Sequence, residues 1–221
     1  MKLTNKNIIM ITAGGVGNRF GNDIPKQYLL LNGRPVISYV IDACRKSRFA
    51  DSILVVSDPL YHDDLRSKYG VDVTSNGPEL NNSKWNGFQY IKEHSNCEKL
   101  IVVDAVRPTI EASVLDDMFR LLDEYDAVAC ARKITDSLGR YNEHVVNREE
   151  YYTMNAPEAF RFPIIFNSFD PQSKITESIQ QLPDTARVYL NFDVPYFDKI
   201  TYPEDLVKAE AFMQWRSQHG K

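Results

Sequence analysis

Short apolar segments alternate with longer amphipathic segments along most of the chain. The apolar segments predict strands at 7–12, 52–57, 71–75, 99–104 and 126–131. The first, second and fourth of these lack the alternation of a half-exposed strand, which is typical of strands buried on both faces of a parallel sheet. Between the strands, apolar residues recur at helical spacing and predict helices at 35–47, 83–94, 111–125 and 202–218. Pro35 and Ser83 are expected to begin two of these helices, Pro35 in a first turn and Ser83 as a cap.

The order of these elements predicts an α/β fold. Alternating strands and helices favour a doubly wound, mostly parallel sheet of Rossmann-like type with helices on both faces. A chain of 221 residues suits one domain, here 1–221. Segment 132–157 breaks the alternation, with short extended candidates around Gly139 and Tyr141–Asn142. We expect this segment to form a hairpin-like β-arm that leaves the domain.

Composition excludes several classes of protein. The net charge is −4 and the pI is near 5.6, so the basic footprint of a nucleic-acid-binding protein is missing. No apolar segment approaches the roughly 18 to 20 residues of a membrane span, and the amino-terminal apolar run is too short for a signal peptide. The cysteines, Cys44, Cys97 and Cys130, are scattered and without metal-site spacing. We therefore expect a cytoplasmic protein with reduced, buried thiols.

The segment ITAGGVGNRFGNDIPKQY, residues 11–28, carries the first chemical signal. Its glycine spacing and Pro25 do not fit a dinucleotide-binding loop, whose helix begins inside the glycine run. A G-K-[ST] sequence of a Walker loop is also missing. Small residues let backbone N–H groups approach phosphate oxygens, and here these are Ala13, Gly14, Gly15 and Gly17. Arg19 and Lys26 add two cations, so the loop suits a polyphosphate; the alternative is a glycine-rich surface turn with solvated bases.

This loop resembles the A-G-G-x-G-x-R-M…P-K-Q signature of the CTP-dependent cytidylyltransferases, which include the methylerythritol-phosphate and ribitol-phosphate enzymes. The doubled glycine is closer to the ribitol-phosphate branch, since the other branch usually reads A-A-G. Three more segments resemble family motifs in the same order: VVDAVRP (102–108), TDSL (135–138) and DKITYPEDLVKAE (198–210). The resemblance covers nearly the whole chain.

The resemblance implies roles for the residues of these motifs. Asp104, at the end of a predicted strand where open α/β sheets bind ligands, would hold Mg²⁺ and help bind the nucleotide. Asp198 is a weaker candidate for a second metal contact. Lys199 would contact the reacting α-phosphate and act in catalysis with Arg19 and Lys26. Asn82 and Ser83 fall where the family reads cytosine.

The resemblance also implies an acceptor site completed by a second subunit. The arm of one chain would reach into the active site of its partner in a homodimer. Candidate acceptor-binding residues are Arg107, Ser137, Arg148 and Thr176; Arg107 is equally expected to hold the turn of its motif. Val103 stands where the family usually has His, and Glu158 stands where it usually has Gln, which adds a charge at the base of the arm.

We therefore predict transfer of CMP from CTP to a polyol phosphate, ribitol 5-phosphate or a similar short one, giving a CDP-polyol and pyrophosphate. One alternative is the methylerythritol-phosphate enzyme of isoprenoid synthesis, and envelope polysaccharide synthesis is the other pathway left open. A non-catalytic nucleotide-binding subunit is disfavoured because Arg19, Lys26 and Asp104 are all present. A dinucleotide oxidoreductase is disfavoured by the loop spacing.

Overall fold

The computed structural model of the chain describes residues 6–15, 24–142, 146–195 and 198–219. Its strands are β1 Asn7–Ala13, β2 Leu30–Leu31, β3 Arg34–Pro35, β4 Ser52–Ser57, β5 Asp72–Ser75, β6 Lys99–Asp104, β7 Ala127–Lys133, β8 Tyr152–Arg161 and β9 Val188–Asn191. Its α-helices are α1 Val36–Lys46, α2 His62–Tyr69, α3 Leu80–His94, α4 Ala112–Leu121, α5 Phe162–Ser168 and α6 Pro203–His219. Short 3₁₀ turns lie at η1 Lys26–Tyr28, η2 Pro59–Tyr61, η3 Arg148–Glu150 and η4 Ser178–Gln181. Gly17 and Arg19 lie outside the described residues.

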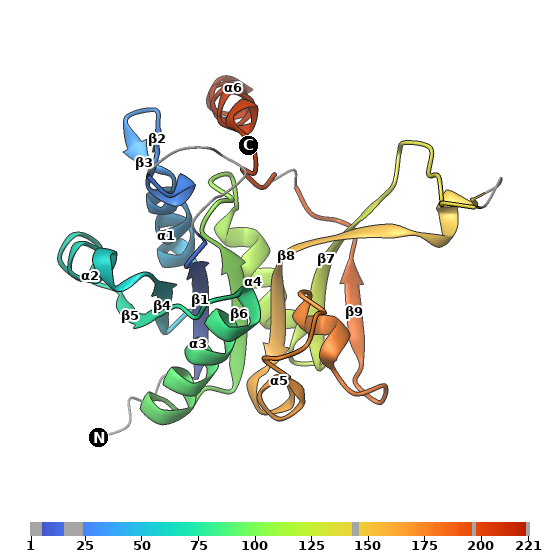
Figure 1. Cartoon of the computed structure of the whole chain (residues 1–221), viewed down its shortest axis with the longest axis horizontal. Coiled ribbons are helices and arrows are strands. Elements are labelled where there is room, and N and C mark those ends of the chain that lie inside the picture. The colour runs from blue at the N-terminus through green and yellow to red at the C-terminus, as the bar shows by residue number, and fades with distance from the viewer. Residues whose placement is uncertain (1–5, 16–23, 143–145, 196–197, 220–221) are drawn as a thin grey trace.

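A mostly parallel sheet forms the centre of the molecule (Figure 1). The described strands run in the order β5-β4-β1-β6-β8-β7-β9, and β2 and β3 form a separate small hairpin. β1 pairs in parallel with both β4 and β6, so the carboxyl ends of these strands meet at one edge of the sheet. β8 runs antiparallel to its neighbours β6 and β7. The predicted α/β class and mostly parallel sheet are therefore confirmed.

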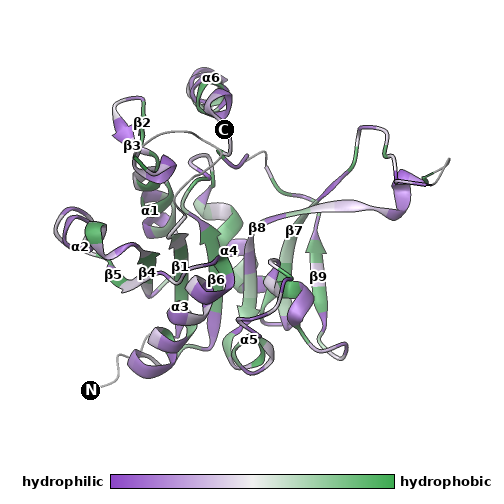
Figure 2. Cartoon of the chain, viewed as in Figure 1, coloured by the Kyte–Doolittle hydropathy of each residue, from purple (hydrophilic) through white to green (hydrophobic). Residues whose placement is uncertain are grey.

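Apolar residues of the strands face helices on both sides of the sheet. One buried cluster joins the sheet to α1, α2 and α4, and a second joins it to α3 and α5. Figure 2 shows the hydrophobic colours concentrated in the strands and hydrophilic colours on the outer turns of the helices. Cys44, Cys97 and Cys130 are buried, and burial raises the pKa of each thiol. The expectation that the three thiols are buried is confirmed.

The structure differs from three predicted details. The end of segment 132–157 lies in β8, whose residues Tyr152–Asn155 pair with the end of β7 but not with β6, and Figure 1 shows this part of β8 running out into the projecting connection. Around Gly139 and Tyr141–Asn142 the described residues form no regular strand, and Arg140 makes an isolated β-bridge. Ser83 does not cap a helix, since α3 begins one turn earlier at Leu80 with Glu79 as its cap residue.

No helix among the described residues is long and apolar enough to cross a membrane.

Candidate active site

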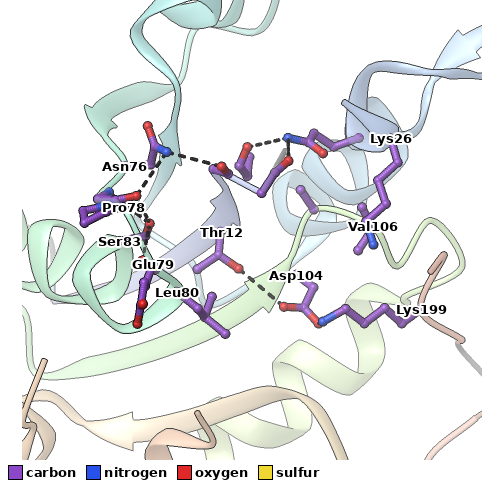
Figure 3. A pocket seen from close by; sticks show the side chains of 16 residues that line it. Thr12, Lys26, Asn76, Pro78, Glu79, Leu80, Ser83, Asp104, Val106 and Lys199 are labelled. Atoms are coloured by element: carbon purple, nitrogen blue, oxygen red, sulfur yellow. Dashed lines mark hydrogen bonds and ion pairs between the residues drawn. The ribbon is translucent and has the colours of Figure 1, made fainter. Parts of the chain in front are cut away.

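A cavity of about 580 Å³ opens at the carboxyl edge of the parallel strands. Its walls come from the residues after β1, from η1, from the β5–α3 connection, from the residues after β6, and from Lys199. The lining residues used below are Ala13, Gly14, Gly15, Lys26, Gln27, Asn76, Gly77, Ser83, Asp104 and Lys199. Figure 3 shows Asn76 and Ser83 on one side of this cavity and Asp104 and Lys199 on the other. Seven of the predicted site residues therefore meet in one place: Ala13, Gly14, Gly15, Lys26, Ser83, Asp104 and Lys199.

A buried glutamine bonds to the backbone at the start of the glycine-rich loop. Gln27 is 3% exposed, and its Nε2 donates to the carbonyl oxygens of Ala13 at 2.6 Å and Gly15 at 3.0 Å. Pro25 precedes the 3₁₀ turn that carries both Lys26 and Gln27. Gln27 fixes the loop, while Lys26 from the same turn lines the cavity. Sequence reasoning assigned no role to Gln27, although it belongs to the quoted P-K-Q segment.

Asp104 is the electrostatic centre of the opposite wall. Its Oδ2 lies 3.1 Å from Lys199 Nζ and 3.2 Å from Arg107 Nε, and its Oδ1 accepts from Thr12 Oγ1 at 3.4 Å. Burial by itself raises the pKa of the Asp104 carboxyl, but the charges of Lys199 and Arg107 outweigh it and lower the pKa to about 2. Asp104 is therefore an anion throughout the physiological pH range.

Arg107 is not placed to bind an acceptor in this chain. Its residue is 5% exposed, its guanidinium is turned toward Asp104, and it does not line the cavity. The structure supports the other predicted role, in which Arg107 holds the turn of its motif. It does so by orienting the carboxylate of Asp104.

The β5–α3 connection forms one wall of the cavity. Ser83, buried in the first turn of α3, accepts from the Gly77 N–H at 3.0 Å and donates to the Glu79 carbonyl at 3.0 Å. Asn82 does not line the cavity, and its Nδ2 donates to the Pro171 carbonyl at 3.4 Å. Of the two predicted base-reading residues, the structure brings only Ser83 to the cavity.

The remaining predicted residues do not line this cavity. Asp198 Oδ1 pairs with Arg132 at 3.3 Å, and Thr176 is exposed with its carbonyl accepting from Lys84. Ser137 is exposed on the β7–β8 connection. Arg148 donates to the Thr135 carbonyl and lines a separate cavity of about 430 Å³ on that connection. Within one chain, the structure does not bring Ser137 or Arg148 to Asp104.

Sequence reasoning missed a buried ion pair beside the site. Lys84 and Glu158 are 5% and 4% exposed, and Lys84 Nζ lies 3.7 Å from Glu158 Oε2. The expected unbalanced charge at Glu158 is therefore matched by a cation from α3. The helical pattern indicates that Lys84 is buried, because it shares one helical face with the apolar residues Phe88 and Ile91, and both of these are buried.

The comparison with protein families decides the identity of this architecture. The family model described as "IspD: 2-C-methyl-D-erythritol 4-phosphate cytidylyltransferase" matches residues 7–215. The chain belongs to the IspD family. The match spans the loop after β1, the Asp104 turn and Lys199 together, so this IspD-family chain carries its cavity within the family's common region.

Relatives of this IspD-family chain include enzymes named for two different acceptors. It is 26% identical over 226 residues to the 2-C-methyl-D-erythritol 4-phosphate cytidylyltransferase of Clostridium botulinum strain Langeland, covering 95% of this chain and 98% of that protein. It is 28% identical over 234 residues to the bifunctional ribulose 5-phosphate reductase/CDP-ribitol pyrophosphorylase Bcs1 of Haemophilus influenzae, covering 96% of this chain and 49% of that protein.

Solved structures share the fold of this IspD-family chain. The 4-diphosphocytidyl-2C-methyl-D-erythritol synthase of Anaerococcus prevotii superposes with a TM-score of 0.80 at 23% identity, covering 95% of this chain and 96% of that one. CMP:2-keto-3-deoxy-manno-octonic acid synthetase, solved with CTP, superposes with a TM-score of 0.71 at 14% identity, covering 96% and 99%. At these identities the likeness establishes the nucleotidyltransferase fold.

The residues of the IspD-family cavity fit a magnesium ion that arrives with a nucleotide. Mg²⁺ commonly takes one or two carboxylates and completes its shell with water and phosphate oxygens. Asp104 supplies one carboxylate at the cavity wall, and its Oδ1 is not the atom paired with Lys199 and Arg107. The described residues hold no group of three or more potential ligands of the His, Cys, Asp or Glu types.

Proposed function

We propose that this chain transfers a cytidylyl group from CTP to a polyol phosphate, with ribitol 5-phosphate as the leading acceptor. The observation that carries the proposal is the convergence of a glycine-rich loop, Lys26, Asp104 and Lys199 on one cavity. An anionic, extended ligand with one reacting phosphorus atom fits such a set of groups.

The proposed transfer is a single displacement at the α-phosphorus of CTP. A phosphate oxygen of the acceptor forms the new bond to the α-phosphorus. The bond between the α-phosphorus and the oxygen that it shares with the β-phosphate breaks, and pyrophosphate leaves. The acceptor phosphate is already largely ionised at neutral pH, so the step needs no general base. Catalysis then rests on positioning and on charge stabilisation.

Each wall of the cavity has a distinct part in this proposal. The backbone N–H groups of the glycine-rich loop, with Lys26, would hold the β- and γ-phosphates. Lys199 would offset charge on the α-phosphate, while Asp104 keeps Lys199 in place at 3.1 Å. Ser83 and the Gly77 backbone form the end of the cavity suited to a base, because they offer hydrogen-bonding groups next to the apolar Leu80.

Magnesium is part of the same proposal. Asp104 would hold the ion, which would neutralise phosphate charge when bound.

The acceptor is proposed from two features. The doubled glycine Gly14-Gly15 resembles the ribitol-phosphate branch, and the relative from Haemophilus influenzae is named a CDP-ribitol pyrophosphorylase. Methylerythritol phosphate remains the second candidate, because the family model and the clostridial relative carry its name.

We further propose a homodimer in which the β7–β8 connection completes the partner's acceptor site. Arg148 and Ser137 lie on a projecting connection and do not line the cavity of their own chain (Figure 1). A second copy of the chain gives these polar groups a site to face, and two-fold dimers are the commonest assemblies.

Pyrophosphate release tests the proposed activity. The purified chain is incubated with CTP, Mg²⁺ and, in separate reactions, ribitol 5-phosphate, glycerol phosphate or methylerythritol 4-phosphate. We expect the largest kcat/KM with ribitol 5-phosphate. Preference for methylerythritol 4-phosphate would replace the leading acceptor by the second candidate, and no release with any of them would reject the activity.

A further inference from the structure

One side chain ties together two walls of the proposed nucleotide cavity. Asn76 follows β5, and its backbone N–H donates to the Ser57 carbonyl at 2.9 Å, so its position is fixed at the end of β4. Its Nδ2 donates to the carbonyl oxygens of Gly14 at 3.2 Å and Gly77 at 3.3 Å (Figure 3). The two carbonyls belong to the loop after β1 and to the loop before α3, and both loops line the cavity.

Asn76 also explains why position 14 is glycine. A Cβ added to Gly14 would lie 2.4 Å from Asn76 Cβ and 3.0 Å from Asn76 Cγ and Nδ2. Asn76 Cβ sits next to its anchored backbone, so it cannot swing aside as the end of a long side chain can. Gly14 does not have a left-handed φ, so close approach, rather than an unusual backbone conformation, requires glycine there.

Gly15 differs from Gly14 in this respect. Among the residues that the structure describes, a Cβ at Gly15 would meet nothing within 4 Å. The two glycines of the doubled pair therefore serve different purposes: Gly15 leaves open space beside the cavity, and Gly14 makes room for Asn76.

We infer that Asn76 is a positioning residue that sets the spacing of the two loops around the nucleotide, with Gly14 as its steric partner. The inference rests on the proposed function in placing CTP in this cavity. The carboxamide donates both hydrogens of one nitrogen, so the Gly14 and Gly77 carbonyls must stay close together. Among the described residues, no other hydrogen bond joins the loop after β1 to the loop before α3.

Three variants and one double variant test this inference. Asn76→Asp replaces the donor by an anion facing two carbonyl oxygens, and Asn76→Gly removes the bridge. Gly14→Ala introduces the clash. In the double variant Gly14→Ala with Asn76→Gly, the atoms that clash with the new methyl group are gone.

The readouts are CTP affinity by equilibrium binding and the KM values for CTP and for the polyol phosphate. We expect Asn76→Asp and Gly14→Ala each to weaken CTP binding about tenfold, the scale of one or two lost hydrogen bonds. The KM for the polyol phosphate should change by less than threefold. Asn76→Gly should weaken CTP binding to a similar extent. The double variant should bind CTP no more weakly than Asn76→Gly alone, because the atoms that clash with the new methyl group are absent and residues in contact do not behave additively.

Asn86→Asp is the matched control. Asn86 lies on α3, and its Nδ2 also donates to a backbone carbonyl, that of Ser75 at 3.1 Å, but it does not line the cavity. Its CTP affinity should stay within twofold of the parent chain. The melting temperature of each variant without CTP reports whether it is folded.

The outcomes separate the inference from the proposed function. A parent chain that binds no CTP refutes the proposed function. A parent that binds CTP, with folded Asn76 variants of unchanged affinity, overturns the positioning role alone. A double variant whose loss of CTP affinity is the product of the two single-variant losses overturns the steric pairing of Gly14 with Asn76.

Discussion

Replacing the buried lysine of the Lys84–Glu158 pair should cost the fold several kcal/mol. Lys84→Met keeps the length and the apolar stem of the side chain and removes its charge. The Glu158 carboxylate, 4% exposed, would keep the N–H groups of Ser178 at 3.2 Å and Ile179 at 3.0 Å but lose its cation. A buried charge left without its partner is costly, so the free energy of unfolding should fall.

The size of the effect follows from the distance and the contacts. Two unit charges separated by the observed 3.7 Å attract each other by roughly 4 kcal/mol at an effective dielectric constant of about 20. Lys84 Nζ also donates to the Thr176 carbonyl at 2.7 Å and to Ser178 Oγ at 2.8 Å. Better burial of the methionine offsets part of this loss, which leaves a predicted destabilisation of about 3–5 kcal/mol.

Urea unfolding at pH 7 with linear extrapolation measures this change. The double variant Lys84→Met with Glu158→Gln removes both charges and should recover at least half of the loss. Lys68→Met is the matched control, because Lys68 pairs with Asp64 at 2.8 Å on an exposed helix face, and its replacement should leave the free energy of unfolding nearly unchanged. A Lys84→Met protein within 1 kcal/mol of the parent, or a double variant that is simply additive, would refute the reasoning.

Three further predictions concern the cavity and the arm. Lys26→Ala should lower turnover about 100-fold, as loss of one preorganised charge does elsewhere, and steady-state kinetics showing less than a threefold change would contradict the phosphate role. Asp104→Asn should strongly reduce Mg²⁺-dependent activity, because a neutral amide holds a hard cation poorly; full activity of the parent in excess chelator would count against the metal. Mixing inactive Lys26→Ala protein with inactive Arg148→Ala protein should restore activity in mixed dimers, whereas sedimentation as a monomer at micromolar concentration would exclude this arrangement.

The pattern of the sequence predicted the parallel half of the sheet well. Buried parallel strands such as β1 and β6 read as continuous apolar runs, and their boundaries were found within a residue or so. β8 was missed because it holds Pro157 and Glu158, which are unfavourable in an ordinary inner strand. In the structure, the β7–β8 register shifts so that Ala156 and Pro157 fall at a bulge. Glu158 is satisfied by Lys84, a contact between distant segments that local patterns do not show.

The residues of the candidate site were also predicted only in part. Residues in the motifs that follow the strands, such as Asp104 and Gly14, meet because the fold brings the strand ends together. Asn82 does not line the cavity, because its side chain bonds to the Pro171 carbonyl, a contact between segments far apart in the sequence. Arg148 and Ser137 lie on a projecting connection, and no pattern in a single chain shows what a partner places opposite them.

The fate of the α-phosphate of CTP distinguishes cytidylyl transfer from simple hydrolysis of CTP. The chain is incubated with CTP labelled at the α-phosphorus, Mg²⁺ and ribitol 5-phosphate, and the products are separated and identified by mass spectrometry. We expect the label to appear in a CDP-polyol formed in equal amounts with unlabelled pyrophosphate. Label found only in CTP, or released as CMP without a polyol product, would contradict cytidylyl transfer to a polyol phosphate.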